Sequence, residues 1–264
     1  MIVLGFDTST QATAVAVRLA DGQTPETRDD PPPGAHPGHA TRLLEMADQL
    51  LASTGVAWRE VDRIAVGIGP GTFTGLRVGV ATARGLAQSL SVELVAVSSP
   101  RALALPALAA ALADDAPGSR AHVAGGDAER DAVLAVIDAR RGEVFVGAYA
   151  PGAEAPLELA EPRALAPAEL ARVIGEAEAA GGGVTRRWLA VGDGAMRFRD
   201  ELESDGIRTP PDASPLHLLS AGAICELAIG ASVRGIEEIL PDYRRRPDAE
   251  LALEAAGTAR APSI

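Results

Sequence analysis

The sequence predicts an α/β fold built from two similar lobes, and three patterns carry this prediction. Short apolar runs alternate with segments of helical periodicity along much of the chain. A hairpin pattern that ends its first strand in an aspartate occurs at Asp7 and again at Asp138. A glycine-rich turn near Gly69 joins an apolar strand to a long helix. This alternation predicts mixed sheets with helices on their faces.

The first lobe opens with a hairpin whose tip carries a carboxylate and hydroxyls. Residues 2–6 and 13–19 are its expected strands, and the tip includes Asp7, Thr8 and Ser9. Such a tip could hold a metal-bound phosphate, as in ATPases with duplicated lobes. The alternative is a turn in which Asp7 accepts hydrogen bonds from nearby backbone N–H groups. The turn is favoured, because Ser9 carries a side chain where phosphate-binding tips usually have glycine.

A loop and an amphipathic helix follow the hairpin. Residues 25–38 include three consecutive prolines and predict a loop. Residues 39–52 predict a helix, because their apolar side chains recur at helical spacing. We interpret His39 as a helix-start or interface residue. The apolar positions of this helix are Leu43, Met46, Ala47, Leu50 and Leu51.

The central stretch is a strand, a tight turn and a helix with one face of small residues. Residues 64–68 predict a buried strand, and residues 69–71 predict the turn. Residues 75–90 predict a helix, whose first turn Thr72 or Thr74 could cap. Spacing alone favours tight packing inside the chain, and anion or partner binding is the alternative. The small face consists of Gly75, Gly79, Ala83 and Ala87, flanked by Leu76, Val80, Leu86 and Leu90.

The later elements predict a second lobe and a tail. We divide the chain into a first lobe at 1–105, a second lobe at 106–240 and a tail at 241–264, with the late helix packing back on the first lobe. Gly192 and Gly194 could pass under an adenine ring, although an ordinary strand-to-helix turn is favoured. Expected strands are 93–97, 132–137, 144–149 and 188–191; expected helices are 102–113, 166–180 and 216–233; a loop is expected at 114–131.

Composition and motifs exclude several classes of function. A formal net charge of -12 argues against a broad basic surface for nucleic acid. The absence of lysine excludes a lysine nucleophile and a lysine-containing phosphate loop. The single cysteine, Cys225, is expected in the core. The four histidines show no metal-binding spacing, so no metal site is expected. The basic run at 244–246 is solvated or meets RNA phosphates or an acidic partner.

The glycine-rich segment resembles a known family signature. Residues 69–79, with the sequence GPGTFTGLRVG, resemble the signature of the TsaB (YeaZ) family. The resemblance covers nearly the whole chain. Further segments that agree, in the same order, are FDTST at 6–10, the helix at His39, DARRGEVF at 138–145, VGDG at 191–194 and PDYRR at 241–245.

This resemblance implies an actin-like, duplicated two-lobe fold of the sugar kinase, Hsp70 and actin class, with ribonuclease H-like lobes. It implies a non-catalytic dimerisation subunit for making N6-threonylcarbamoyladenosine beside the anticodon of tRNA. The implied partners are the transferase TsaD, which carries the metal-ligand histidines, and the ATPase TsaE, with tRNA reached through the complex. For the chain alone, the resemblance leaves a homodimer open, with a second copy in place of TsaD. No cofactor is expected in the chain, although ATP or ADP could bind at the interface of the complex.

The resemblance also assigns a partner surface to the two helices of the first lobe, which in the family pack on the same helices of TsaD or of a second TsaB. A bulky residue at Gly79 is expected to abolish TsaD binding without unfolding the chain. The residue after His39 is Ala40, where a serine is expected. The interface candidates are His39, Leu43, Met46, Leu50, Gly75, Leu76, Gly79, Val80 and Ala83, and the candidates for a vestigial nucleotide cleft are Asp7, Thr8, Ser9, Gly192 and Gly194.

Two enzyme classes remain as alternatives. An ATP-dependent kinase or ATPase of the same fold would bind nucleotide with magnesium and depend on Asp7. A glycoprotease-like metallohydrolase is disfavoured, because the chain lacks the histidine pair. The first residues lack the basic and apolar regions of a signal peptide, and no apolar run reaches membrane-span length. We therefore expect a cytoplasmic protein without membrane contact.

Overall fold

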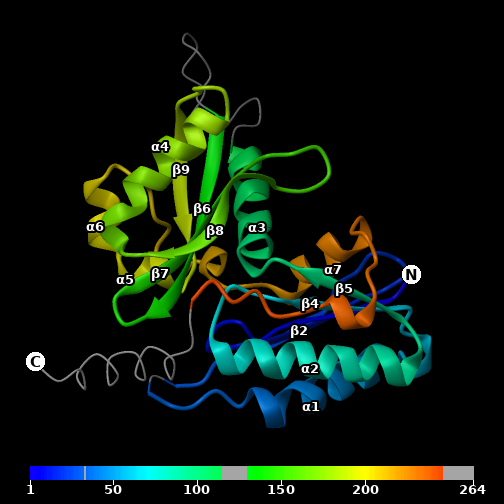
Figure 1. Cartoon of the computed structure of the whole chain (residues 1–264). Helices are drawn as coiled ribbons and strands as arrows, with labels where there is room; N and C mark the ends of the chain where they lie inside the picture. The colour runs from blue at the N-terminus through cyan, green and yellow to red at the C-terminus, as the bar shows by residue number, and fades with distance from the viewer. Residues whose placement is uncertain (33, 115–129, 246–264) are drawn as a thin grey trace, which may run out of the picture.

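The first lobe is built on a five-stranded mixed sheet (Figure 1). The computed structural model describes residues 1–32, 34–114 and 130–245. The strands are β1 (Val3–Asp7), β2 (Thr13–Arg18), β3 (Glu26–Asp29), β4 (Arg63–Gly67) and β5 (Glu93–Val97). They lie in the order β3-β2-β1-β4-β5, with β1 antiparallel to β2 and parallel to β4. All residues of β1 and β4 are buried, which explains their continuous apolar runs.

The second lobe repeats this arrangement with a four-stranded sheet. Its strands are β6 (Arg130–Arg140), β7 (Glu143–Ala150), β8 (Leu157–Leu165) and β9 (Arg186–Val191). The order is β8-β7-β6-β9, and β6 is antiparallel to β7 and parallel to β9, as β1 is to β2 and β4. An isolated parallel bridge joins Leu189 to Arg208 beside β9. The expected α/β fold with two duplicated lobes is therefore confirmed.

Helices cover both sheets and join the two lobes. Figure 1 shows α1 and α2 side by side on one face of the first sheet. α7 packs on the opposite face, against β1 and β2, while α3 packs on β6 of the second sheet and on α7. The two lobes therefore meet through α7 on the first sheet and α3 on the second sheet, which pack on each other. The helices are α1 (His39–Thr54), α2 (Phe73–Leu90), α3 (Ser99–Asp114), α4 (Leu170–Ala180), α5 (Asp193–Arg197), α6 (Arg199–Ser204) and α7 (Ala221–Ile229).

Two edge strands that the sequence did not predict and four short 3-10 helices complete the elements of the described residues. The loop expected at 25–38 is wrong in part, because Glu26–Asp29 forms β3, a short polar edge strand without the apolar signal of a buried one. β8 is a second edge strand that the pattern missed. The 3-10 helices that flank or link the longer elements include Trp58–Glu60, Pro167–Glu169 and Ile236–Glu238.

The long helix expected at 216–233 is also wrong. Pro215–His217 forms a separate 3-10 helix, and α7 begins only after Ser220. The Ser220 hydroxyl accepts a hydrogen bond from the Ala223 N–H at 3.2 Å and so caps the shorter helix. The expected boundary between residues 105 and 106 falls inside α3. Residues 115–129 of the expected loop and 246–264 of the expected tail lie outside the described residues. In the part of the chain that is described, no helix is long and apolar enough to span a membrane.

Candidate functional site

The first hairpin tip is closed by the chain's own hydrogen bonds. The buried Asp7 carboxylate accepts from the Ser9 N–H at 2.7 Å and from the Ser9 hydroxyl at 2.6 Å, both through Oδ1. Its Oδ2 accepts from the Ser99 hydroxyl at 2.6 Å. A Cβ at Gly67 would lie 1.7 Å from Asp7 Oδ2, so the end of β4 also presses on the carboxylate. This arrangement is the turn that the sequence favoured.

Thr8 fixes the hairpin tip to α2 through the small residues of that helix. The Thr8 hydroxyl donates to the Gly75 carbonyl at 2.7 Å. A Cβ at Gly75 would lie 1.9 Å from the Thr8 carbonyl oxygen, and one at Gly79 would lie 2.4 Å from Thr8 Oγ1. The small face of α2 therefore points into the chain, against β1 and β4. The expected phenotype of a bulky residue at Gly79 is wrong, because such a residue would clash inside the lobe.

The interface candidates form the layer between the two helices and their own sheet. Leu43, Met46 and Leu50 pack in one apolar cluster with Val80 and Ala83 of α2 and with β1, β2 and β4. The outward faces of α1 and α2 carry other residues, including Ala40 and the half-exposed Leu44 on α1, and Ala81 and Gly85 on α2. The candidates that are buried are His39, Leu43, Met46, Leu50, Gly75, Leu76, Gly79, Val80 and Ala83.

The second hairpin tip is stabilised by arginines instead of serines. Asp138 Oδ1 accepts from the Arg140 N–H at 2.8 Å, and Oδ2 pairs with Arg197 Nη1 at 2.8 Å. The Asp138 N–H donates to Asp193 Oδ1 at 2.9 Å. Burial, with a smaller contribution from the Asp138 carboxylate, raises the pKa of Asp193. The two acidic groups thus join the tip of β6 to the start of α5.

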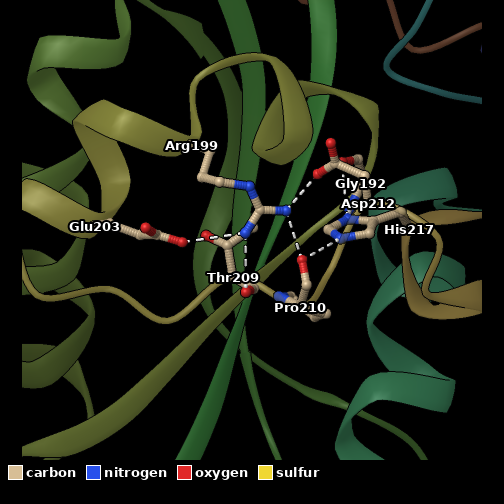
Figure 2. A network of polar contacts seen from close by, with 7 residues as sticks. All are labelled: Gly192, Arg199, Glu203, Thr209, Pro210, Asp212 and His217. Carbon is tan, nitrogen blue, oxygen red and sulfur yellow. Dashed lines mark hydrogen bonds and ion pairs between the residues drawn. The ribbon is translucent and has the colours of Figure 1, made fainter.

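Gly192 and Gly194 pack against the β6 backbone. Gly192 has a φ of 111°, and a Cβ there would lie 2.2 Å from the Val136 carbonyl oxygen. Its N–H donates to His217 Nδ1 at 3.2 Å, and His217 Nε2 lies 3.0 Å from the Pro210 carbonyl oxygen. Figure 2 shows this network continuing through Pro210 to Arg199. The glycines therefore serve the strand-to-helix turn that the sequence favoured.

Two cavities lie between the hairpin tips, and both are lined by Gln11, Asp138 and Arg140. One, of about 510 Å³, reaches Gly192 and Asp193. The other, of about 620 Å³, reaches His39 and the first turn of α2. Of the five residues expected to outline a nucleotide cleft, Gly192 lines the smaller cavity. The other four, Asp7, Thr8, Ser9 and Gly194, are described residues that line neither of these two cavities.

A segment at 241–245 crosses from one lobe to the other, which sequence reasoning missed. The Tyr243 ring lies 5.1 Å from Phe73, centroid to centroid, and its hydroxyl accepts from Arg77 Nε at 3.0 Å. On the second lobe, Arg244 Nη1 pairs with Glu161 at 2.7 Å and Arg245 Nε with Glu143 at 3.2 Å. These arginines are thus paired with acidic side chains, and Arg246 lies outside the described residues.

The single cysteine and the possible metal-ligand side chains do not form a reactive site within the described residues. Cys225 is fully buried, and burial raises the pKa of its thiol to about 12, so it is a core residue. Within the described ranges, no group of three or more histidine, cysteine, aspartate and glutamate side chains is placed to hold a metal ion.

Comparison with known proteins gives one family model and several relatives. The family model described as TsaD, tRNA N6-adenosine threonylcarbamoyltransferase, matches residues 31–198. The tRNA threonylcarbamoyladenosine biosynthesis protein TsaB of Haemophilus influenzae is 34% identical over 145 residues, which cover 55% of this chain and 52% of that protein. The TsaB of Escherichia coli is 32% identical, over 56% of this chain and 55% of that protein. The chain thus spans about half the length of these curated relatives.

Solved structures agree over a longer stretch. A Pseudomonas aeruginosa protein described as having similarity to peptidase YeaZ superposes with a TM-score of 0.66 at 29% identity, covering 92% of this chain and 99% of that one. The structure described as YeaZ from Pseudomonas aeruginosa gives a TM-score of 0.65 at 28% identity, with the same coverage.

Proposed function

We propose a role in tRNA modification for this chain. The chain belongs to the family described as TsaD, tRNA N6-adenosine threonylcarbamoyltransferase, and within it resembles the TsaB (YeaZ) proteins. The chain is a non-catalytic partner subunit in the biosynthesis of N6-threonylcarbamoyladenosine. It binds and activates a TsaD-like transferase, works with a TsaE-like ATPase and reaches tRNA through the complex. On its own it forms a homodimer.

The observation that carries the non-catalytic part of this proposal is the closed tip at Asp7. Both carboxylate oxygens of Asp7 accept hydrogen bonds from Ser9 and Ser99, and the residue is 2% exposed, so the carboxylate serves the hairpin and is poorly placed for a metal-bound phosphate. Thr8, the next polar group, donates its hydroxyl proton to the backbone of α2. The residues that would act on a phosphate therefore stabilise the hairpin instead.

The partner surface that we propose is the outward face of α1 and α2. These helices lie side by side on the outside of the first sheet (Figure 1). Leu44, in the first half of α1, is 50% exposed, and Ala40, Ala81 and Gly85 are exposed small residues that allow another helix to approach closely. The buried candidates beneath this face hold the two helices in place.

A second candidate function is nucleotide binding, with ATPase or kinase activity. The cavity of about 510 Å³ favours it, because Gly192 and the Asp138 tip line that cavity together. This function requires magnesium-dependent binding of ATP by the isolated chain. The partner function requires none.

Reconstituted threonylcarbamoyl transfer tests the main proposal. TsaD, TsaE and the enzyme that supplies threonylcarbamoyl-adenylate, all from the same organism, would be incubated with tRNA and radioactive threonine, with and without this chain. The proposal predicts that label enters tRNA only when the chain is present. Equal incorporation without the chain would contradict it, and titration of the isolated chain with ATP and magnesium would then test the second candidate.

A further inference from the structure

Residues 241–245 form a strap that contacts both lobes and lines the larger cavity (Figure 1). On the first lobe, the Asp242 N–H donates to the Ile68 carbonyl at 2.8 Å. The Tyr243 ring packs on the first turn of α2, and Ile239, just before the strap, is buried in the apolar layer beneath α1 and α2. A backbone hydrogen bond and apolar packing therefore hold this end of the strap, and salt does not screen such contacts as it screens charges.

The second-lobe end of the strap is held by two arginines with acidic partners. Arg244 Nη1 pairs with Glu161 at 2.7 Å, and Arg245 Nε pairs with Glu143 at 3.2 Å. Arg245 Nη1 also donates to the Ala139 carbonyl at 2.5 Å. The side chains of Glu161 and Glu143 are 68% and 42% exposed. Because ion pairs of such exposed groups contribute little each and weaken with salt, this is the end of the strap that can release.

The strap forms part of the wall of the cavity of about 620 Å³. Tyr243, Arg244 and Arg245 line this cavity together with Gln11 of the first lobe and Arg140 of the second. The lobes also meet where α3 packs on α7. Release of the strap from the second lobe would leave the contact of α3 with α7 in place and would widen the cavity on the side of the strap.

We propose that the strap is a reversible clasp, whose release from Glu161 and Glu143 lets the two lobes separate and opens the larger cavity. The strap stays attached to the first lobe, and ionic strength sets the fraction of open molecules. Gln11 and Arg140 line the smaller cavity as well, so the clasp controls access to both. The clasp does not depend on the proposed partner function.

The distance between the two lobes tests this clasp. Nitroxide labels on Ser89→Cys in the first lobe and on Asp200→Cys in the second, both at exposed positions, report this distance by double electron–electron resonance. Cys225 is fully buried and takes up no label in the folded chain. Raising sodium chloride from about 20 mM to about 500 mM is expected to increase the population at longer distances by about threefold or more. A distance distribution that does not change with salt would overturn the proposal.

Neutral variants of the two acidic partners test the clasp at constant salt. Glu143→Gln combined with Glu161→Gln removes both carboxylates that hold the strap. Glu169→Gln combined with Glu203→Gln makes the same change of charge at exposed glutamates that pair with other arginines of the second lobe, and it is the matched control. At low salt, the first pair is expected to raise the population at longer distances by about threefold or more, and the control pair by less than about 1.5-fold. Equal distance distributions for the two double variants would overturn the proposal.

Discussion

The carboxylates of Asp7 and Asp138 make the same local hydrogen bond in the two lobes. Each Oδ1 accepts from the backbone N–H two residues further on, at 2.7 Å in the first lobe and 2.8 Å in the second. Asp7 is the last residue of β1, and Asp138 lies two residues before the end of β6; these are the first strands of the two hairpins. The second oxygen differs, because Ser99 binds Asp7 and Arg197 binds Asp138. The duplication therefore extends to single hydrogen bonds, while the chemistry around each tip has diverged.

The Ser99 hydroxyl links two parts of the first tip, and we predict that Ser99→Ala destabilises the chain by about 1–3 kcal/mol. The hydroxyl donates to Asp7 Oδ2 and accepts from the Gly69 N–H at 3.1 Å. Its removal leaves a buried carboxylate oxygen and a buried N–H without partners. Urea unfolding measures the change, with Ser89→Ala at an exposed position as the control. A loss below about 0.5 kcal/mol would show that this link is dispensable.

Two glycines of α2 are predicted to respond to alanine in opposite directions. Gly79→Ala places a Cβ 2.4 Å from Thr8 Oγ1 and is expected to destabilise the chain by about 1–3 kcal/mol. Gly85 is exposed with nothing within 4 Å of its added Cβ, so Gly85→Ala is expected to stabilise by about 0.5–1 kcal/mol. Thermal unfolding of both variants, followed by circular dichroism, measures the pair. The same sign for both would contradict the inward orientation of the small face.

The buried His39 predicts a pH dependence of stability. Its pKa in the folded chain is lowered from 6.5, so the unfolded chain binds the proton more readily. The stabilisation is present above pH 6.5 and is lost as the pH falls below it, by up to about 1 kcal/mol between pH 6.5 and 5.5. His39→Gln should flatten this slope in urea unfolding. His36→Gln, at an exposed position, should retain it, and equal slopes for the two variants would refute the assignment.

Strong periodic signals predicted the buried elements, and the weak ones were missed for physical reasons. β1, β4 and β6 carry apolar runs because they are buried, so the alternation of strands and helices was readable. β3 is an edge strand of polar residues, and its pairing with β2 leaves no apolar pattern. The rings of Tyr243 and Phe73 are in contact although the two residues are far apart in the sequence, and local sequence patterns do not predict such a contact.

Helical spacing predicts which residues of α1 and α2 share a face, but it does not predict which face points inward. Gly75, Gly79 and Ala83 share a face, and that much follows from helical geometry. Whether the face points inward depends on the sheet that packs against it, and the structure turns it towards Thr8. Helical spacing already separates the outward Leu44 from the buried Leu43, but the packed structure decides that the face with Leu43 meets the sheet and the face with Leu44 is exposed.

We predict that a charge in place of the exposed leucine of the proposed partner surface prevents binding of the partner. Leu44→Glu puts a carboxylate on the outward face of α1 without disturbing the core, because Leu44 is 50% exposed. Leu157→Glu makes the same change at a leucine that is 55% exposed on β8 of the second lobe, and it is the matched control. The stability of both variants should stay within about 0.5 kcal/mol of the unaltered chain.

Size-exclusion chromatography with light scattering tests this surface most directly. The unaltered chain and both variants would each be measured alone and with TsaD from the same organism. We predict a one-to-one complex with TsaD for the unaltered chain and for Leu157→Glu, and no complex for folded Leu44→Glu. A full complex with Leu44→Glu, or none with the unaltered chain even when TsaE and nucleotide are present, would contradict the partner function at this surface.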